Sequence, residues 1–277
     1  MKRVKAVILF LISAMIICQA CLAQEKKSAE QEIDGFSLIQ YDKGGEKKWK
    51  LNGSSAEVEG DTVKINDISA LSFGDSEFLK LKAREGDFNK EEQIVHLKEN
   101  VVIKSTDGTA LMTDSLKWNA DSKNVFTEDP VTIKKADFEV NGVGGVCDME
   151  NKTAELKKDI RADIDSVPGY IRSDGLAGNK TNITCDGPLE INYNKNKASF
   201  LNNVVIRDAQ GDLMADRIDV YFGKNTRKIK CVVARGNVRI INGENVTYSE
   251  KAIYLVDEGR VILPKRPRLV IQNERTE

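Results

Sequence analysis

The chain has 277 residues, of which 31% are charged and 40% hydrophobic, and its formal net charge at pH 7 is -1. This balance of charge excludes the strongly positive field with which nucleic-acid-binding proteins attract phosphates, so we expect no nucleic-acid partner. The length suffices for one large or two modest domains with cores of their own.

The N-terminus has the features of an export signal. A basic flank precedes an apolar run over residues 6–17, and the small residue Ala20 stands directly before Cys21. We interpret residues 1–23 as a signal peptide or membrane anchor. The Ala20-Cys21 junction resembles a bacterial lipoprotein signal and predicts lipidation of Cys21, but an uncleaved helix and simple cleavage stay open. All three place the rest of the chain outside the cytoplasm.

Polar and charged residues dominate the segment that follows, residues 24–34, which is typical of a solvated stalk. After it, apolar and polar residues alternate, as at 79–83, 136–140 and 218–222. No segment sustains helical periodicity for three turns, so the pattern predicts an all-β fold. The stretch 165–186 contains the breakers Pro168, Gly169, Gly175 and Gly178 and predicts a connection between two domains.

An internal repeat relates the two predicted domains. The pattern of residues 100–114, Asn-Val-Val-Ile, Gly and Leu-Met-x-Asp, reappears at 203–216, and a shorter echo follows at 236–240. Such a unit, a strand with a returning strand, cannot bury its apolar face alone and needs stacked neighbours.

On these residues the sequence resembles the periplasmic lipopolysaccharide-export family, the Lpt proteins of type C and type A with the related OstA-like domain. The type C resemblance rests on Gly35-Phe36, Trp49-Lys50-Leu51, Asn100-Val101, Gly108, Thr113-Asp114 and Asp129-Pro130-Val131. The type A resemblance rests on Phe200, Asn203-Val204, Ala215-Asp216, Ala234, Gly236-Asn237-Val238 and the segment 268–271. The chain departs from the family pattern at Glu99 and Asn202, which replace a glycine before Asn-Val.

The resemblance implies an open β-jellyroll of two facing antiparallel sheets, in two consecutive modules. The predicted organisation is signal or anchor 1–23, stalk 24–34, an LptC-like jellyroll 35–164, a connection 165–186 and an LptA/OstA-like module 187–277. Lipopolysaccharide is the implied ligand, and the implied partners are the inner-membrane Lpt ABC transporter, other Lpt jellyrolls joined by edge strands, and the membrane itself through the anchor. The implied location is the periplasm, at the inner membrane.

Alternating apolar residues supply a candidate lining for the acyl chains between the sheets. The candidates are Ile103, Leu116, Trp118, Ile133, Phe138, Ile191, Ile206, Ile218, Val220, Phe222, Ile229 and Ile240. An ordinary packed core has the same periodicity, so both interpretations stay open for each residue.

Residues for catalysis or metal binding do not form a recognisable pattern. The single histidine, His96, stands between Val95 and Leu97 and is predicted to point away from the core. Cys147, Cys185 and Cys231 are odd in number and widely spaced, and a Cys147–Cys185 bridge is left open. We therefore predict no enzyme, no cofactor and no metal. The first alternative is a structural β-solenoid or surface scaffold, and the second is a polysaccharide-acting β-helix enzyme.

Overall fold

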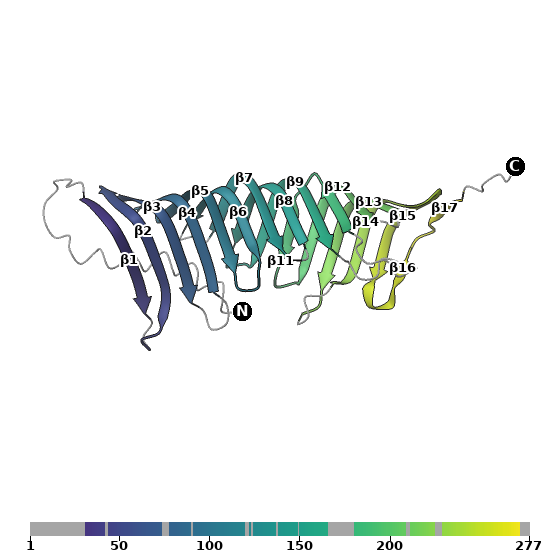
Figure 1. Cartoon of the computed structure of the whole chain (residues 1–277). Coiled ribbons are helices and arrows are strands. Elements are labelled where there is room, and N and C mark those ends of the chain that lie inside the picture. The colour runs from purple at the N-terminus through teal and green to yellow at the C-terminus, as the bar shows by residue number, and fades with distance from the viewer. Residues whose placement is uncertain are drawn as a thin grey trace. The chain divides into compact units, whose positions relative to one another are not determined.

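In the computed structural model of the chain, the described residues form almost entirely antiparallel β-strands (Figure 1). It describes residues 31–41, 44–73, 78–89, 91–119, 122, 124–136, 138–148, 150–165, 180–208, 211–224 and 229–271. The strands are β1 (Gln31–Tyr41), β2 (Lys47–Glu59), β3 (Thr62–Phe73), β4 (Phe78–Asn89), β5 (Ile94–Ser105), β6 (Ala110–Asn119), β7 (Asn124–Lys135), β8 (Phe138–Asp148), β9 (Thr153–Asp165), β10 (Lys180–Cys185), β11 (Leu189–Asn192), β12 (Lys197–Asp208), β13 (Gly211–Phe222), β14 (Ile229–Asn242), β15 (Asn245–Leu255), β16 (Arg260–Ile262) and β17 (Arg268–Val270). One short 3-10 helix, η2 (Val256–Glu258), lies among the described strands. The all-β prediction is confirmed.

Contacts within the chain divide it into two compact units. Unit 1 comprises residues 1–136 and 146–151, and unit 2 comprises residues 137–145 and 152–277. We describe each unit by itself.

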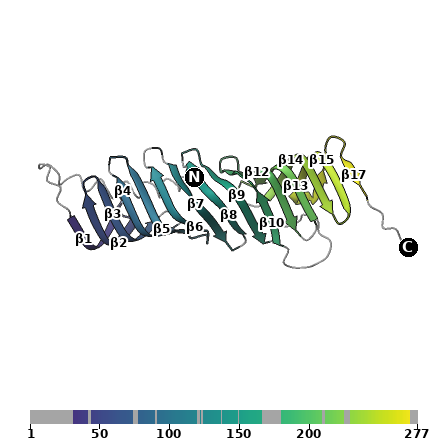
Figure 2. The same ribbon diagram turned by 90° about the horizontal axis from the view of Figure 1, so that it is seen from above.

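Unit 1 contains consecutive antiparallel strand pairs from β1 to β7. Figure 2 shows these strands side by side in chain order. In β5, Val95 and Leu97 are buried, whereas His96 between them is partly exposed on the opposite face. Alternation at period 2 thus gives the sheet one apolar face, which must be covered.

Unit 2 follows the same plan. β9 pairs with both β10 and β11, and these two strands also pair with β12 on their other side. β10 and β11 are therefore successive parts of one interrupted strand. β12 to β15 then pair in chain order, and β15 also pairs with the short strands β16 and β17.

Several long strands bend near their middle, where the pairing register shifts. In β5, Glu99 and Asn100 stand opposite the single residue Asp114 of β6, and their φ angles are 58° and 56°. Two residues opposite one form a β-bulge, which bends the strand. Asn202 and Asn203 form the same bulge in β12, with φ angles of 63° and 53°.

The repeated Asn-Val pattern therefore marks bends within strands and not strand ends. The valine after each bulge points inward and is fully buried: Val101 and Val204 are 0% exposed and Val238 is 1% exposed. Glu99 and Asn202, which replace the glycine of the family pattern, adopt the left-handed conformation that a glycine favours.

The bends give each unit two facing walls, because the two halves of a bent strand belong to different parts of the sheet. In unit 1, residues from both halves pack into one core cluster. Its buried members are Leu51, Ile68, Ala70, Ala83, Phe88, Val95, Leu97, Val101, Leu116 and Trp118. The fold is thus the predicted open β-jellyroll of facing antiparallel sheets.

Two predicted segments differ from the structure. The stalk predicted over 24–34 overlaps β1, because residues 31–34 pair with residues 55–58 of β2. The connection predicted over 165–186 contains β10, and residues 166–179 lie outside the described part. The domain limits 35–164 and 187–277 stay a prediction.

Candidate functional site

The inner face of each wall carries apolar rows that run across the strands. In the second half of β5, Val101 lies beside the bend and pairs with Thr113, and Ile103 lies farther from it and pairs with Leu111. We call the row beside the bend the proximal row and the next inward row the distal row. The proximal Val101 is fully buried, whereas the distal Ile103 and Leu111 are partly exposed.

Unit 2 repeats this arrangement. Val204 occupies the proximal row of β12, and the distal row contains Ile206, Leu213 and Ile240 on three neighbouring strands. Leu213 is buried, whereas the two isoleucines at its sides are partly exposed. On this wall of each unit, the residue beside the bend is thus fully buried, whereas the distal row keeps partly exposed members.

The facing wall also has two rows. In unit 1, Leu97 and Leu116 form the proximal pair, and Val95, Trp118 and Val125 form the distal row. Trp118 is the last inward residue of β6 before the strand ends. In unit 2 the corresponding distal row contains Ala198, Val220 and Val232.

The interior is filled near the bends of unit 1. A methyl group on Gly86 would come within 2.5 Å of Ile68 Cδ1, and one on Gly53 within 2.5 Å of Phe36 Cε1. Glycine is needed at these two positions because inward side chains occupy the space that a Cβ would take. Room for a ligand must therefore be sought toward the distal rows.

The structure separates the predicted lining residues into two groups. Four are buried: Leu116, Trp118, Ile218 and Val220. Eight are partly exposed: Ile103, Ile133, Phe138, Ile191, Ile206, Phe222, Ile229 and Ile240. Ile103 and Ile133 share one distal row through Leu111, and Ile206 and Ile240 share another through Leu213.

Sequence reasoning missed six members of the distal rows, Leu111, Leu213, Val95, Val125, Ala198 and Val232. The first two stand two residues before an inward residue of the same strand, so alternation carried the signal for them. Their place in a row with the predicted isoleucines depends on strand register, which alternation does not specify.

The outer face of unit 2 carries an ion cluster around Asp219, whose side chain is 1% exposed. Lys197 Nζ and Ser199 Oγ each lie 2.8 Å from Asp219 Oδ1, and Arg217 Nε lies 2.9 Å from it. Arg235 pairs with the other carboxylate oxygen. Burial alone raises the pKa of Asp219, but the donated hydrogen bonds outweigh it and lower the pKa to about 2. The cluster stabilises the wall from outside.

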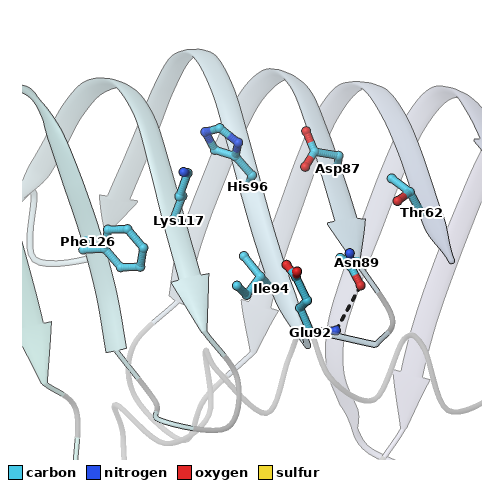
Figure 3. A pocket seen from close by; sticks show the side chains of 8 residues that line it. All are labelled: Thr62, Asp87, Asn89, Glu92, Ile94, His96, Lys117 and Phe126. Carbon is cyan, nitrogen blue, oxygen red and sulfur yellow. Dashed lines mark hydrogen bonds between the residues drawn. The ribbon is translucent and has the colours of Figure 1, made fainter.

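The outer face of unit 1 has a shallow hollow of about 290 Å³ at the related position (Figure 3). Its lining residues are Thr62, Asp87, Asn89, Glu92, Ile94, His96, Lys117 and Phe126. His96 lies between Asp87 and Lys117 on neighbouring strands, facing away from the core as predicted. Burial, followed by the charge of Lys98, lowers the pKa of His96, so the imidazole is neutral at neutral pH. No serine or cysteine lines this hollow.

The three cysteines of the described part are free thiols. The Cys147–Cys185 bridge that the sequence left open is therefore not formed. Burial raises the pKa of both thiols, which makes them poor nucleophiles. Cys231 pairs with Tyr221 on the outer face, because a register shift beside Phe222 turns it away from Ile229.

In the same described part, no group of three or more His, Cys, Asp or Glu side chains is placed to hold a metal ion.

Comparison with known families agrees with this architecture. Residues 6–165 match the family described as lipopolysaccharide-assembly, LptC-related. The chain belongs to this family. Residues 182–276 match a second family, the LptA/(LptD N-terminal domain) LPS transport protein. A search of curated proteins finds no match.

The two matches confirm an LptC-type domain followed by an LptA-like domain and give the chain a role in lipopolysaccharide transport. Both are transport families, which supports the expectation that the chain is not an enzyme. The predicted anchor and Cys21 lie outside the described residues. Within the described ranges, no helix has the length and apolar character needed to cross a membrane.

Proposed function

We propose that this LptC-related chain is a non-enzymatic periplasmic carrier. It holds the lipid A acyl chains of lipopolysaccharide between its facing walls and passes the lipid from the inner-membrane ABC transporter toward the outer membrane. One observation carries the proposal: on one wall of each unit, the inward residues are fully covered at the bend, as at Val101 and Val204, but only partly covered at Ile103 and Ile206.

Incomplete coverage matters because apolar surface left near water is a binding surface for apolar ligands. Burying one methylene group is worth about 0.8 kcal/mol, so several long acyl chains in water would meet a barrier of tens of kcal/mol. Contact with the distal rows removes much of that barrier. The proposal thus assigns contact with the acyl chains first to the partly exposed residues. The buried Ile218 and Leu116 pack behind these residues in the core.

Edge strands supply the proposed route between jellyrolls. β1 pairs with β2 alone among the described strands, and it exposes Ile33 (47%), Leu38 (40%) and Tyr41 (52%). In unit 2, β17 exposes Leu269 (58%). An apolar edge with unpaired backbone groups favours strand addition by a partner, and other Lpt jellyrolls are the proposed partners.

The anchor belongs to the same proposal. The basic flank, the apolar run and the Ala20-Cys21 junction support attachment to the inner membrane, by a lipid on Cys21 or by an uncleaved helix. Intact-mass measurement of the protein from membranes distinguishes these forms. A mature chain that begins at Gln24 would contradict both of them and leave only secretion.

The main competing function is that of a structural scaffold, in which the walls enclose nothing but their own side chains. Photocrosslinking in cells distinguishes a carrier from a scaffold. A photoreactive residue at Ile103 or Ile206 points inward, and the same residue at the neighbouring Val102 or Val205 points to the opposite face.

A carrier crosslinks to lipopolysaccharide from positions 103 and 206 and not from positions 102 and 205. Absence of any lipid adduct at all four positions favours the scaffold. Equal labelling from both faces would show contact with lipid at the surface and would also contradict the proposal.

A further inference from the structure

A buried hydrogen-bond donor in unit 1 has no acceptor in the described part of the lipid-free core. The Trp118 side chain is 3% exposed, and its indole Nε1 finds no hydrogen-bond partner among the residues that the structure describes. An indole N–H can only donate. Because buried donors are almost always paired, an unpaired one calls for an explanation such as a ligand or an ordered water.

The position of this donor points to the proposed lipid site. Trp118 occupies the distal row between Val95 and Val125. It belongs to the core cluster against which Ile103 and Leu81 pack from the other halves of their strands. An acyl chain that lies between the distal rows therefore passes beside the indole.

The equivalent position of unit 2 carries no such donor. Trp118 follows Asp114 in β6 at the same interval at which Val220 follows Asp216 in β13, and both occupy distal rows. Valine offers the ligand only apolar contact. At this position of the repeat the indole donor is thus present in unit 1 and replaced by an apolar side chain in unit 2, where Tyr254 places a buried hydroxyl-bearing side chain beside Val232.

We propose that the Trp118 indole N–H donates a hydrogen bond to an oxygen atom of the bound acyl chain. This inference rests on the proposed function and specifies its ligand: unit 1 selects acyl chains that carry a carbonyl or hydroxyl oxygen within reach of the indole. Such oxygens accept hydrogen bonds. A chain of pure hydrocarbon leaves the donor unpaired and binds less tightly for that reason.

The test uses the full chain with Trp49→Phe, which leaves Trp118 as the one remaining tryptophan of the sequence. The indole N–H then gives a single signal in a ¹⁵N–¹H spectrum. The probes are tetradecanoate and 3-hydroxytetradecanoate, and their binding is measured by displacement of a fluorescent fatty acid. The matched variant Trp118→Phe keeps an aromatic ring and removes the donor.

The expected result is a downfield shift of the indole proton when a probe binds, and binding about fivefold to tenfold weaker in Trp118→Phe, the effect of one neutral hydrogen bond. A shift with the hydroxylated probe alone identifies the hydroxyl as acceptor. A shift with both probes identifies the carboxyl oxygens.

Two outcomes overturn the inference. If the probes bind but the indole signal does not move and Trp118→Phe binds equally well, a water or nothing pairs with the indole, and the proposed carrier function stands without this contact. If neither probe displaces the fluorescent fatty acid, the carrier function itself fails and the inference falls with it.

Discussion

The Asn237 side-chain amide donates a 2.9 Å hydrogen bond to Asp216 Oδ2 across the bend between β14 and β13. Asn203 makes the equivalent bond, of 2.5 Å, to Asp186. Both asparagines have positive φ angles and precede a fully buried valine. Each bond ties a bulge to an acidic residue beside it, Asp216 in β13 and Asp186 between β10 and β11, so the bend that creates two walls is fixed by a side chain.

The bend at β14 should depend on Gly236. Its φ is 73°, and a Cβ there would lie 2.3 Å from Asp216 Oδ2. We expect Gly236→Ala to lower the free energy of unfolding by about 2 to 3 kcal/mol, through backbone strain and loss of the bond to Asn237.

Gly243→Ala is the matched control for the bend. Gly243 also has a positive φ, 56°, but a Cβ there would meet nothing within 4 Å. Only the strain of about 1 kcal/mol is expected. Urea unfolding measures both variants, and equal losses would show that the contact with Asp216 does not matter.

Asp219 should stabilise unit 2 in a pH-dependent way. Its pKa in the folded protein is about 2, below the value of about 3.9 in an unfolded chain. The stabilisation is therefore fully present above the unfolded pKa and is lost as the pH falls through the folded pKa. Asp219→Asn should cost about 2 kcal/mol at neutral pH, and the difference from wild type should shrink between about pH 4 and about pH 2.

The control for Asp219 is Asp257→Asn, which breaks the exposed pair with Lys230. We expect a change of less than about 0.5 kcal/mol there. Denaturant titration at several pH values measures both variants. A gap between wild type and Asp219→Asn that stays constant down to about pH 2 would disprove the assigned role.

A charge on the distal row of unit 2 should be poorly tolerated. Val220 is 6% exposed and faces inward, so Val220→Glu should lower the free energy of unfolding by about 3 kcal/mol or more. Val205→Glu, on the outward face of β12, should change it by less than about 0.5 kcal/mol. Thermal melts followed by circular dichroism compare the two, and similar melting temperatures would mean that water already reaches Val220.

The edge strands should be sites of assembly. A photoreactive residue at Leu38 of β1 or Val270 of β17 should crosslink to an Lpt component or to a second copy of the chain in cells. The same residue at Lys82, exposed within the paired strand β4, should give no such product. Labelling from Lys82 as strong as from Leu38 would mean that contact is not made through edges.

Much of the fold follows from the sequence because strand alternation and the repeat are local signals. The valines of the repeat, Val101 and Val204, are buried as inward residues, and His96 faces outward as predicted. The end of the stalk predicted over 24–34 is wrong, because residues 31–34 belong to β1. The strand of Trp49 is paired on both sides, with β1 and β3, since the segment before it pairs as a strand instead of forming a stalk.

Other features depend on register, which alternation cannot supply. The bulge at Glu99 and Asn100 contains no glycine, so no residue of the sequence marks its position. A register shift places Cys231 on the outer face, away from Ile229. The ion cluster at Asp219 joins residues from three strands and has no linear motif. None of these three features can be found before the strands are paired.

The central claim, that the walls hold lipopolysaccharide, is tested most directly by the lipid that accompanies the protein. The full chain is purified from membranes in mild detergent, alongside an Ile206→Asp variant, and the bound lipid is identified by mass spectrometry. The account predicts lipopolysaccharide with wild type and much less of it with Ile206→Asp. Wild-type protein that carries no lipopolysaccharide, or carries the same amount as the variant, would contradict it.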